Sequence, residues 1–127
     1  MMGETILYLS DQATNGNSVP GALRAAGYEV VSTNSANQAI ALLYLLHTVV
    51  GVVVSRLTRG QNRVDVVRNL HAIRPEVPIV LLCSNQMMRL PSFVDACVDA
   101  GQPLEKLIAA VRRLFLAKRF QLLSAQH

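Results

Sequence analysis

The hydrophobic pattern of this chain alternates between short β-branched runs and longer amphipathic segments. The run VVGVVVS at 49–55 is apolar on both alternating faces, which indicates a central strand covered by helices on both sides. Similar short runs, rich in Val, Ile and Leu, recur along the sequence. The predicted strands are 5–9, 28–33, 49–55, 78–83 and a short one around 97–98.

The segments between these runs carry apolar residues at helical spacing. The predicted helices are 18–27, 35–47, 61–73, a poorly defined one at 85–90, and a last one from 103 through 115 towards 123. Ser35 stands where it can cap the second helix, and Gly27 where it can end the first. The second helix is apolar nearly all round, which is typical of a helix that is buried or bound to another molecule.

This alternation of strands and helices predicts a fold. Strands that alternate with amphipathic helices form right-handed βαβ units, so we expect an α/β domain with a doubly wound parallel sheet. The short elements favour five strands in the flavodoxin-like order 2-1-3-4-5, with helices on both faces. At 127 residues and 51% hydrophobic content, the chain fits a single domain over 1–127. We place its core at about 4–116 and a C-terminal helix extension at about 117–127.

The charge balance argues against a strongly basic binding surface. The formal net charge is +4, but only 16% of the residues are charged. The one basic cluster consists of Arg112, Arg113, Lys118 and Arg119, and a solvated helix face explains it best. Weak, salt-sensitive nucleic-acid binding is the less favoured interpretation.

Two stretches could be mistaken for membrane or export signals. The first residues, 1–10, have neither a basic segment nor a cleavage site, so we expect a cytoplasmic protein. The stretch 35–55 lacks charged residues, but His47, Thr48 and Gly51 interrupt it, and its two halves have helical and strand composition. We therefore predict no transmembrane helix.

The cysteines and histidines give little sign of metal chemistry. Cys83 and Cys97 lie in apolar surroundings without a CxxC spacing, and we interpret them as reduced, buried core residues, with a redox switch as the alternative. His47, His71 and His127 are too dispersed for a metal site. We expect no metal and no cofactor.

Several segments together resemble the receiver domain of bacterial response regulators. They are ILYLSDQ, LRAAGYEVVST, SANQAIALL, VVRNLHAIRPEVPIVLLCS and PLEKLIAAVRRL. The resemblance covers almost the whole chain, and AIRPEVPIVLL is its most specific part. It implies the five-stranded fold predicted above and a role in two-component signal transduction and phosphorelay.

The resemblance also implies where a phosphorylation site would lie. In the family, an acidic pair after strand 1 and an aspartate ending strand 3 bind Mg²⁺, and that aspartate accepts a phosphoryl group. A hydroxyl residue ending strand 4 and a lysine ending strand 5 hold the phosphate. The matching positions here are Ser10 and Asp11, Ser55, Cys83 and Ala100. Cys97 matches the aromatic switch residue of strand 5, so the two cysteines replace residues that couple activation in the family.

These replacements remove the chemistry of phosphoryl transfer. Asp11 with two hydroxyls offers Mg²⁺ too little negative charge, and the hydroxyl of Ser55 is a weak nucleophile without a base. No lysine neutralises the transferring group. We therefore predict a degenerate pocket and no enzymatic activity. Arg56 either reaches Asp11 in place of the metal or points into solvent, and the sequence leaves both open.

The last helix carries a second apolar stripe beyond its core-facing one, and this indicates association. The predicted interaction surface comprises Cys97, Leu104, Lys106, Arg112, Arg113, Leu116, Arg119, Phe120 and Leu123. We expect a phosphorylation-independent pseudo-receiver that binds a protein partner or dimerises through helix 4, strand 5 and helix 5. A sensor that binds a nucleotide or flavin in the emptied pocket is the other alternative, besides nucleic-acid binding.

Overall fold

A computed structural model describes residues 4–10, 19–55, 63–83, 96–99 and 103–125. For residues 63, 64, 83, 96, 99 and 118–125 it describes the backbone alone. The predicted helix at 85–90 lies outside the described residues.

The strands form one parallel sheet with the predicted order. They are β1 (Thr5–Leu9), β2 (Glu29–Thr33), β3 (Val49–Val54), β4 (Ile79–Cys83) and β5 (Ala96–Asp99). Their order is β2-β1-β3-β4-β5, so β3 lies at the centre between β1 and β4. The prediction of a five-stranded, flavodoxin-like sheet is therefore confirmed.

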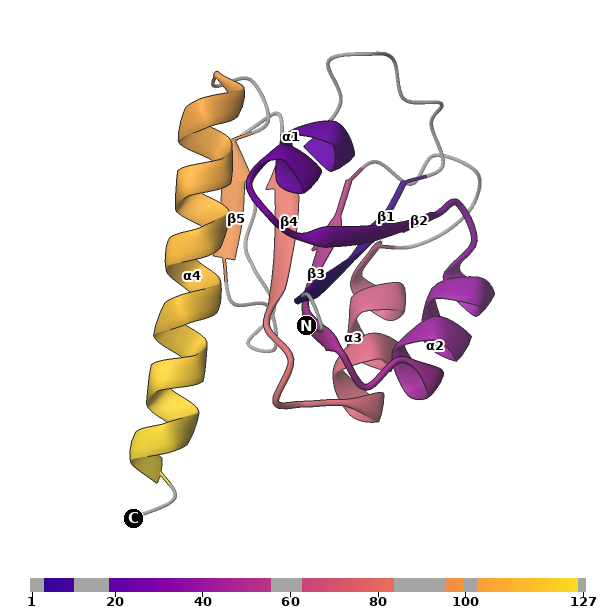
Figure 1. Cartoon of the computed structure of the whole chain (residues 1–127). Coiled ribbons are helices and arrows are strands. Elements are labelled where there is room, and N and C mark those ends of the chain that lie inside the picture. Colours follow the sequence, from indigo (N-terminus) through magenta and orange to yellow (C-terminus); the bar gives the residue numbers. More distant parts are fainter. Residues whose placement is uncertain (1–3, 11–18, 56–62, 84–95, 100–102, 126–127) are drawn as a thin grey trace.

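The helices cover both faces of this sheet (Figure 1). They are α1 (Val19–Ala25), α2 (Ala36–Leu45), α3 (Arg63–Ile73) and α4 (Leu104–Ala125). Helices α2 and α3 lie together on one face, and α1 and α4 lie on the other. The hydroxyl of Ser35 accepts a hydrogen bond from the backbone N–H of Gln38, which confirms the predicted cap of α2.

The pleat of the strands divides the core into two clusters. On β1, Leu7 and Leu9 pack with α2 and α3, whereas Ile6 and Tyr8 pack with α1 and α4. Both sets are almost fully buried, and each buried Leu or Ile contributes about 1.5–3 kcal/mol to folding. This two-sided burial explains why the strands read as continuous apolar runs.

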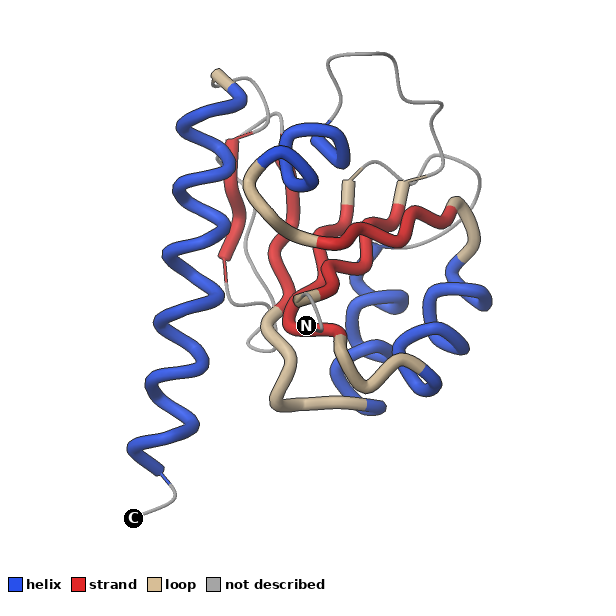
Figure 2. The backbone as a smooth tube through the Cα atoms, viewed as in Figure 1, coloured by secondary structure: helices blue, strands red, loops and turns tan. Residues whose placement is uncertain are grey.

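Helix α4 is longer than the sheet that it covers. It has 22 residues, or about 33 Å, whereas the longest strand, β3, has 6 residues, or about 20 Å. Figure 2 shows that α4 runs beside the strands and continues past the edge at which they begin. Within the predicted extension at about 117–127, residues 117–125 are the end of this same continuous helix.

A close backbone approach fixes α4 on the centre of the sheet. The ring of Phe115, which is 6% exposed, lies directly over Gly51 of β3. A Cβ atom at Gly51 would overlap that ring, so the absence of a side chain makes room for it.

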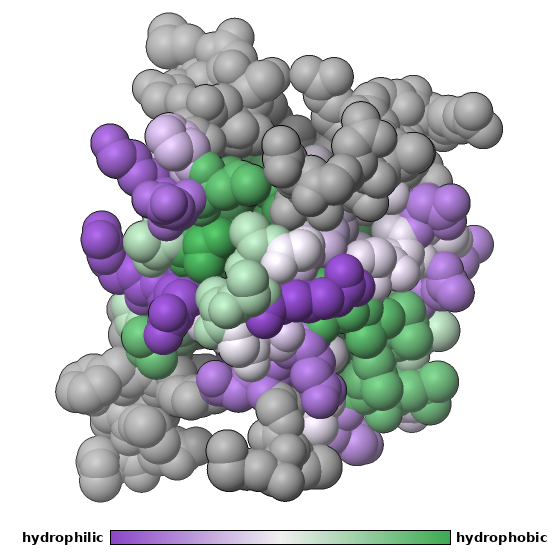
Figure 3. Space-filling view, turned by 45° about the horizontal axis from the view of Figure 1, so that its top comes forward, coloured by the Kyte–Doolittle hydropathy of each residue, from purple (hydrophilic) through white to green (hydrophobic). Residues whose placement is uncertain are grey.

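Helix α2 leaves two large side chains in solvent. Tyr44 is 71% exposed and Leu45 66% exposed, while Ala39 and Leu43 of the same helix are fully buried. Figure 3 shows hydrophobic surface on the side of the molecule where α2 lies. The stretch 35–55 forms α2 and β3, and no helix in the described part of the chain is long and apolar enough to span a membrane.

The structure corrects the interpretation of the cysteines as reduced and buried. Cys97 is disulfide-bonded and only half-buried. Sequence spacing gave no signal for this bond, because it depends on β4 and β5 lying side by side.

We predict that Gly51→Ala destabilises the protein by about 1–3 kcal/mol, because the new methyl group overlaps the ring of Phe115. Urea denaturation of wild type and variant measures this loss. Adding Phe115→Leu should restore part of the stability of Gly51→Ala. A Gly51→Ala protein as stable as wild type would contradict the close packing.

We also predict that Gly27→Ala costs about 1 kcal/mol. Gly27 has a φ of 103° and ends α1, where the N–H of Tyr28 donates to the carbonyl of Leu23 (3.1 Å). Thermal unfolding measures the loss, and Gly27→Asn should lose less, since Asn tolerates this conformation better. Equal losses for Ala and Asn would argue against a conformational cause.

Candidate functional site

Ser10 and Ser55 come together where β1 and β3 end. The register pairs Leu9 with Val54, so the next residues, Ser10 and Ser55, lie level on neighbouring strands. The backbone N–H of Ser55 donates to the carbonyl of Leu9 (2.8 Å). Ser10 is 8% exposed, and Ser55 is half-buried. The structure thus brings these two predicted pocket residues to one edge of the sheet.

The other predicted pocket residues are only partly described. Cys83 ends β4, two positions beyond Leu81, which pairs with Val54. Its backbone therefore reaches the same edge as Ser55. Asp11, Arg56 and Ala100 lie outside the described residues, so the substitution of Arg56 for a metal stays a prediction.

Thr33 is a third hydroxyl residue at this edge, and the sequence reasoning missed it. The backbone N–H of Ser10 donates to the carbonyl of Thr33 (3.0 Å). The Thr33 side chain is buried; its Oγ1 pairs with Gln38 Oε1 and accepts from the N–H of Ser35 (3.2 Å). Thr33 therefore anchors the start of α2. The strand order β2-β1-β3, which was predicted, was the signal that could have revealed it.

Hydroxyl residues stand at the ends of β2, β1 and β3 on this edge, whereas β4 ends in Cys83 and β5 ends in Asp99. Thr33 ends β2, and Ser10 and Ser55 directly follow β1 and β3. Within the described ranges, no three His, Cys, Asp or Glu side chains gather as a metal site would require. The hydroxyl of Ser55 needs a neighbouring base to act as a nucleophile, and the sequence has no Asp or Glu between Glu29 and Asp65.

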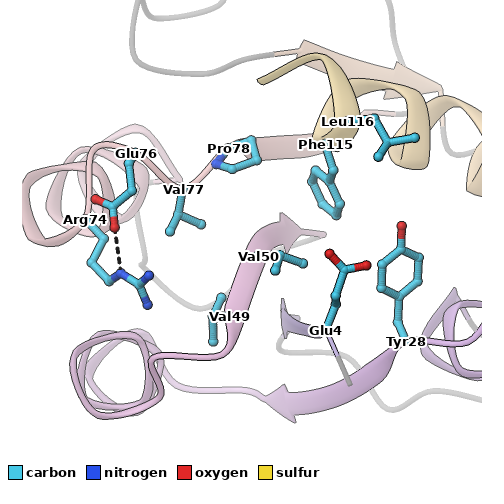
Figure 4. Close-up of a pocket in the computed structure, with 10 residues that line it drawn as sticks. All are labelled: Glu4, Tyr28, Val49, Val50, Arg74, Glu76, Val77, Pro78, Phe115 and Leu116. Carbon is cyan, nitrogen blue, oxygen red and sulfur yellow. Dashed lines mark hydrogen bonds and ion pairs between the residues drawn. The ribbon is translucent and has the colours of Figure 1, made fainter. Parts of the chain in front are cut away.

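A cavity of about 150 Å³ lies at the opposite edge of the sheet, where the strands begin (Figure 4). It is lined by Glu4, Tyr28, Val49, Val50, Arg74, Glu76, Val77, Pro78, Phe115 and Leu116. Phe115 and Leu116 come from α4, and the other residues come from the segments that lead into four strands. These residues are far apart in sequence, so only the topology reveals the cavity.

Arg74 uses its donors to hold the structure beside this cavity. Its Nε donates to Glu76 Oε2 (3.0 Å), and its Nη1 donates to the carbonyl of Leu46 at the end of α2 (3.0 Å). Partial burial raises the pKa of Glu76, but hydrogen bonds from its own backbone and from Arg74, with the attraction of the guanidinium, outweigh it and lower the pKa overall. Arg74 thus ties the end of α3 to the end of α2.

The predicted interaction surface lies mostly on α4. Lys106, Arg112 and Arg113 are exposed, and Leu116 is 56% exposed. Leu104 and Cys97 are half-buried. Arg119, Phe120 and Leu123 belong to α4, but their side chains are outside the described set. Binding through this surface stays a prediction.

Most of the predicted core stripe of α4 is confirmed. Leu107, Val111 and Phe115 are buried against the sheet, as is Ile108. Leu114 is half-buried beside them. The face that carries these residues is therefore occupied, and Lys106, Arg112, Arg113 and Leu116 lie on the exposed side of α4.

Comparison with known proteins gives matches in structure but not in sequence. No family model matches the chain, and no curated protein matches it. NtrX from Brucella abortus superposes with a TM-score of 0.84 at 17% identity, over 98% of this chain and 29% of that one. A CheY-like receiver domain protein from Methanospirillum hungatei JF-1 superposes with a TM-score of 0.81 at 14% identity, over 94% and 99%.

The chemotaxis response regulator CheY4 of Vibrio cholerae is a further structural neighbour. It gives a TM-score of 0.76 at 15% identity and covers 89% of this chain and 99% of that one. Identities this low establish a common architecture and no common activity. The chain has the fold of response-regulator receiver domains.

Proposed function

We propose that this chain is a pseudo-receiver: a signal-transduction domain that binds a protein partner without accepting a phosphoryl group. It acts in the cytoplasm through α4 and β5, either as a homodimer or on another signalling protein. It has no enzymatic activity. The observation that carries the proposal is the hydroxyl of Ser55 at the end of the central strand.

The chemistry at the carboxyl edge supports the loss of phosphorylation. Ligands of open α/β sheets bind outside the carboxyl ends of the strands, and here Ser10 and Ser55 stand there side by side. Phosphoryl transfer depends on positioning and on neutralising charge by metal and cationic groups. Two neighbouring hydroxyl groups supply neither a carboxylate acceptor nor the negative charge that holds Mg²⁺.

The exposed side of α4 supports protein binding. Leu116 is 56% exposed, and Phe120 and Leu123 follow it at the spacing of one helix face. The helix α4 is longer than the strands, and its C-terminal end extends past the edge at which the strands begin. A helix end with large apolar residues beyond its own core gains free energy by covering them.

We predict that incubation with acetyl phosphate and Mg²⁺ adds no phosphoryl group, because the acceptor carboxylate and its metal ligands are replaced. Intact-mass spectrometry under neutral conditions measures the addition. A receiver domain with its acceptor aspartate, treated in parallel, is the positive control. A stoichiometric adduct would overturn the proposal: an acid-labile one would indicate an acyl phosphate on a carboxylate, and an acid-stable one that is lost in Ser55→Ala would lie on the Ser55 hydroxyl.

We predict that wild type is a dimer and that Leu116→Asp weakens dimerisation by about tenfold or more, because the carboxylate is desolvated in the interface. Light scattering over a concentration series measures both. Ala117→Asp is the matched control, since it adds the same charge on the next, exposed residue of α4 and should dimerise like wild type. A monomeric wild type would refute the homodimer.

A further inference from the structure

Cys97 forms a disulfide bond, and the proposed binding of a protein partner gives this bond no role. Cys97 is disulfide-bonded, and the sequence has one other cysteine, Cys83. The two residues stand on neighbouring parallel strands: Cys97 pairs in register with Leu81, and Cys83 pairs with Asp99. Residues two apart along a strand occupy the same face, so positions 83 and 97 are diagonal neighbours on one face of the sheet.

We propose that Cys83 and Cys97 form a reversible disulfide that links β5 to β4. The domain would then respond to the thiol–disulfide balance of its surroundings by forming or breaking this bond at the edge of the sheet. The bond forms by exchange with the disulfide form of a small dithiol, which takes up the two protons and two electrons of the protein thiols and becomes two thiols. A dithiol reverses it: one thiolate attacks a sulfur, a mixed disulfide forms, and the second thiolate releases the protein as two thiols and leaves the reagent as a disulfide.

The position of Cys97 makes the bond accessible. Cys97 is half-buried, whereas its neighbour Val98 is 5% exposed. Strand β5 is also the outermost strand of the sheet, with β4 as its sheet neighbour. The partial exposure of Cys97 gives a reducing thiol access to the bond, which complete burial in the core would prevent.

A covalent link stabilises β5, which carries Cys97, more than it stabilises the other strands. β5 has 4 residues, the fewest among the described strands, and β4 is its one hydrogen-bonded neighbour. A short edge strand contributes few hydrogen bonds and little burial, so its local stability is low. Linking it to β4 removes conformational entropy from the opened state and holds β5 in register.

The disulfide also affects the packing of α4 through β5. Val98 is adjacent to Cys97 but faces the other layer, where it packs in one cluster with Leu107 and Ile108 of α4. Cys97 itself packs against the cluster formed with α2 and α3. Release of β5 therefore loosens the support under the first turns of α4. This inference stands whether or not the exposed side of α4 binds a partner.

The state of the bond is tested first by mass. The full-length protein is denatured in N-ethylmaleimide, with and without prior dithiothreitol, and its intact mass is measured. We expect no adduct before reduction and two after it. An adduct without reduction, or a disulfide-linked dimer of chains, would overturn the proposed bond.

The switch is tested on the native protein in buffers of varied ratio of oxidised to reduced dithiothreitol. We expect reduction to lower the Tm by roughly 5–15 °C and to speed amide exchange in β5 by at least about tenfold. Cys83→Ala/Cys97→Ala is the matched control and should show no dependence on the ratio. A bond that resists excess dithiol in the native protein, or unchanged exchange in β5, would refute the switch.

Discussion

The position of β3 between two layers of helices is the constraint on which the structure depends. β3 pairs with β1 on one side and β4 on the other, and its side chains alternate between the two core clusters. Val52 and Val54 face α2 and α3, and Val53 faces α1 and α4. Gly51 completes this arrangement, because its missing side chain admits Phe115 and seats α4 on the sheet. This packing therefore fixes the position of the residues at both ends of β3.

The two edges of the sheet have opposite character as a result. At the carboxyl edge, β1, β2 and β3 lead to the hydroxyl residues Ser10, Thr33 and Ser55, and Thr33 holds the start of α2. At the other edge, Glu4, Arg74 and Glu76 line a cavity beside α4. Ligands of open α/β sheets usually bind at the carboxyl edge, where this chain has the neighbouring residues Ser10 and Ser55.

Strand β5 connects the proposals about this chain. Through Val98 it supports α4, and through Cys97 it is linked to the layer of α2 and α3. A short strand between two layers responds to small changes in its attachment, since few contacts oppose its opening. A covalent bond at this point acts on the shortest described strand of the sheet and on the helix proposed to bind partners.

The sequence by itself determined the sheet, its strand order and the faces of the helices. Alternation of Val-rich runs with amphipathic segments is a local property, and burial on both faces leaves a parallel strand no polar positions. The cap at Ser35 and the helix end at Gly27 were predictable for the same reason, because each depends on the conformation of a few consecutive residues. The pairing of Ser10 with Ser55 followed from the strand order.

The tertiary structure decided what joins residues distant in sequence. The cavity around Tyr28 and Phe115, the anchoring of Leu46 by Arg74 and the disulfide at Cys97 all depend on which strands and helices become neighbours. No periodicity records such contacts. The cysteines are the clearest case: the spacing of Cys83 and Cys97 along the chain is uninformative, and only the register of β4 with β5 brings their positions together.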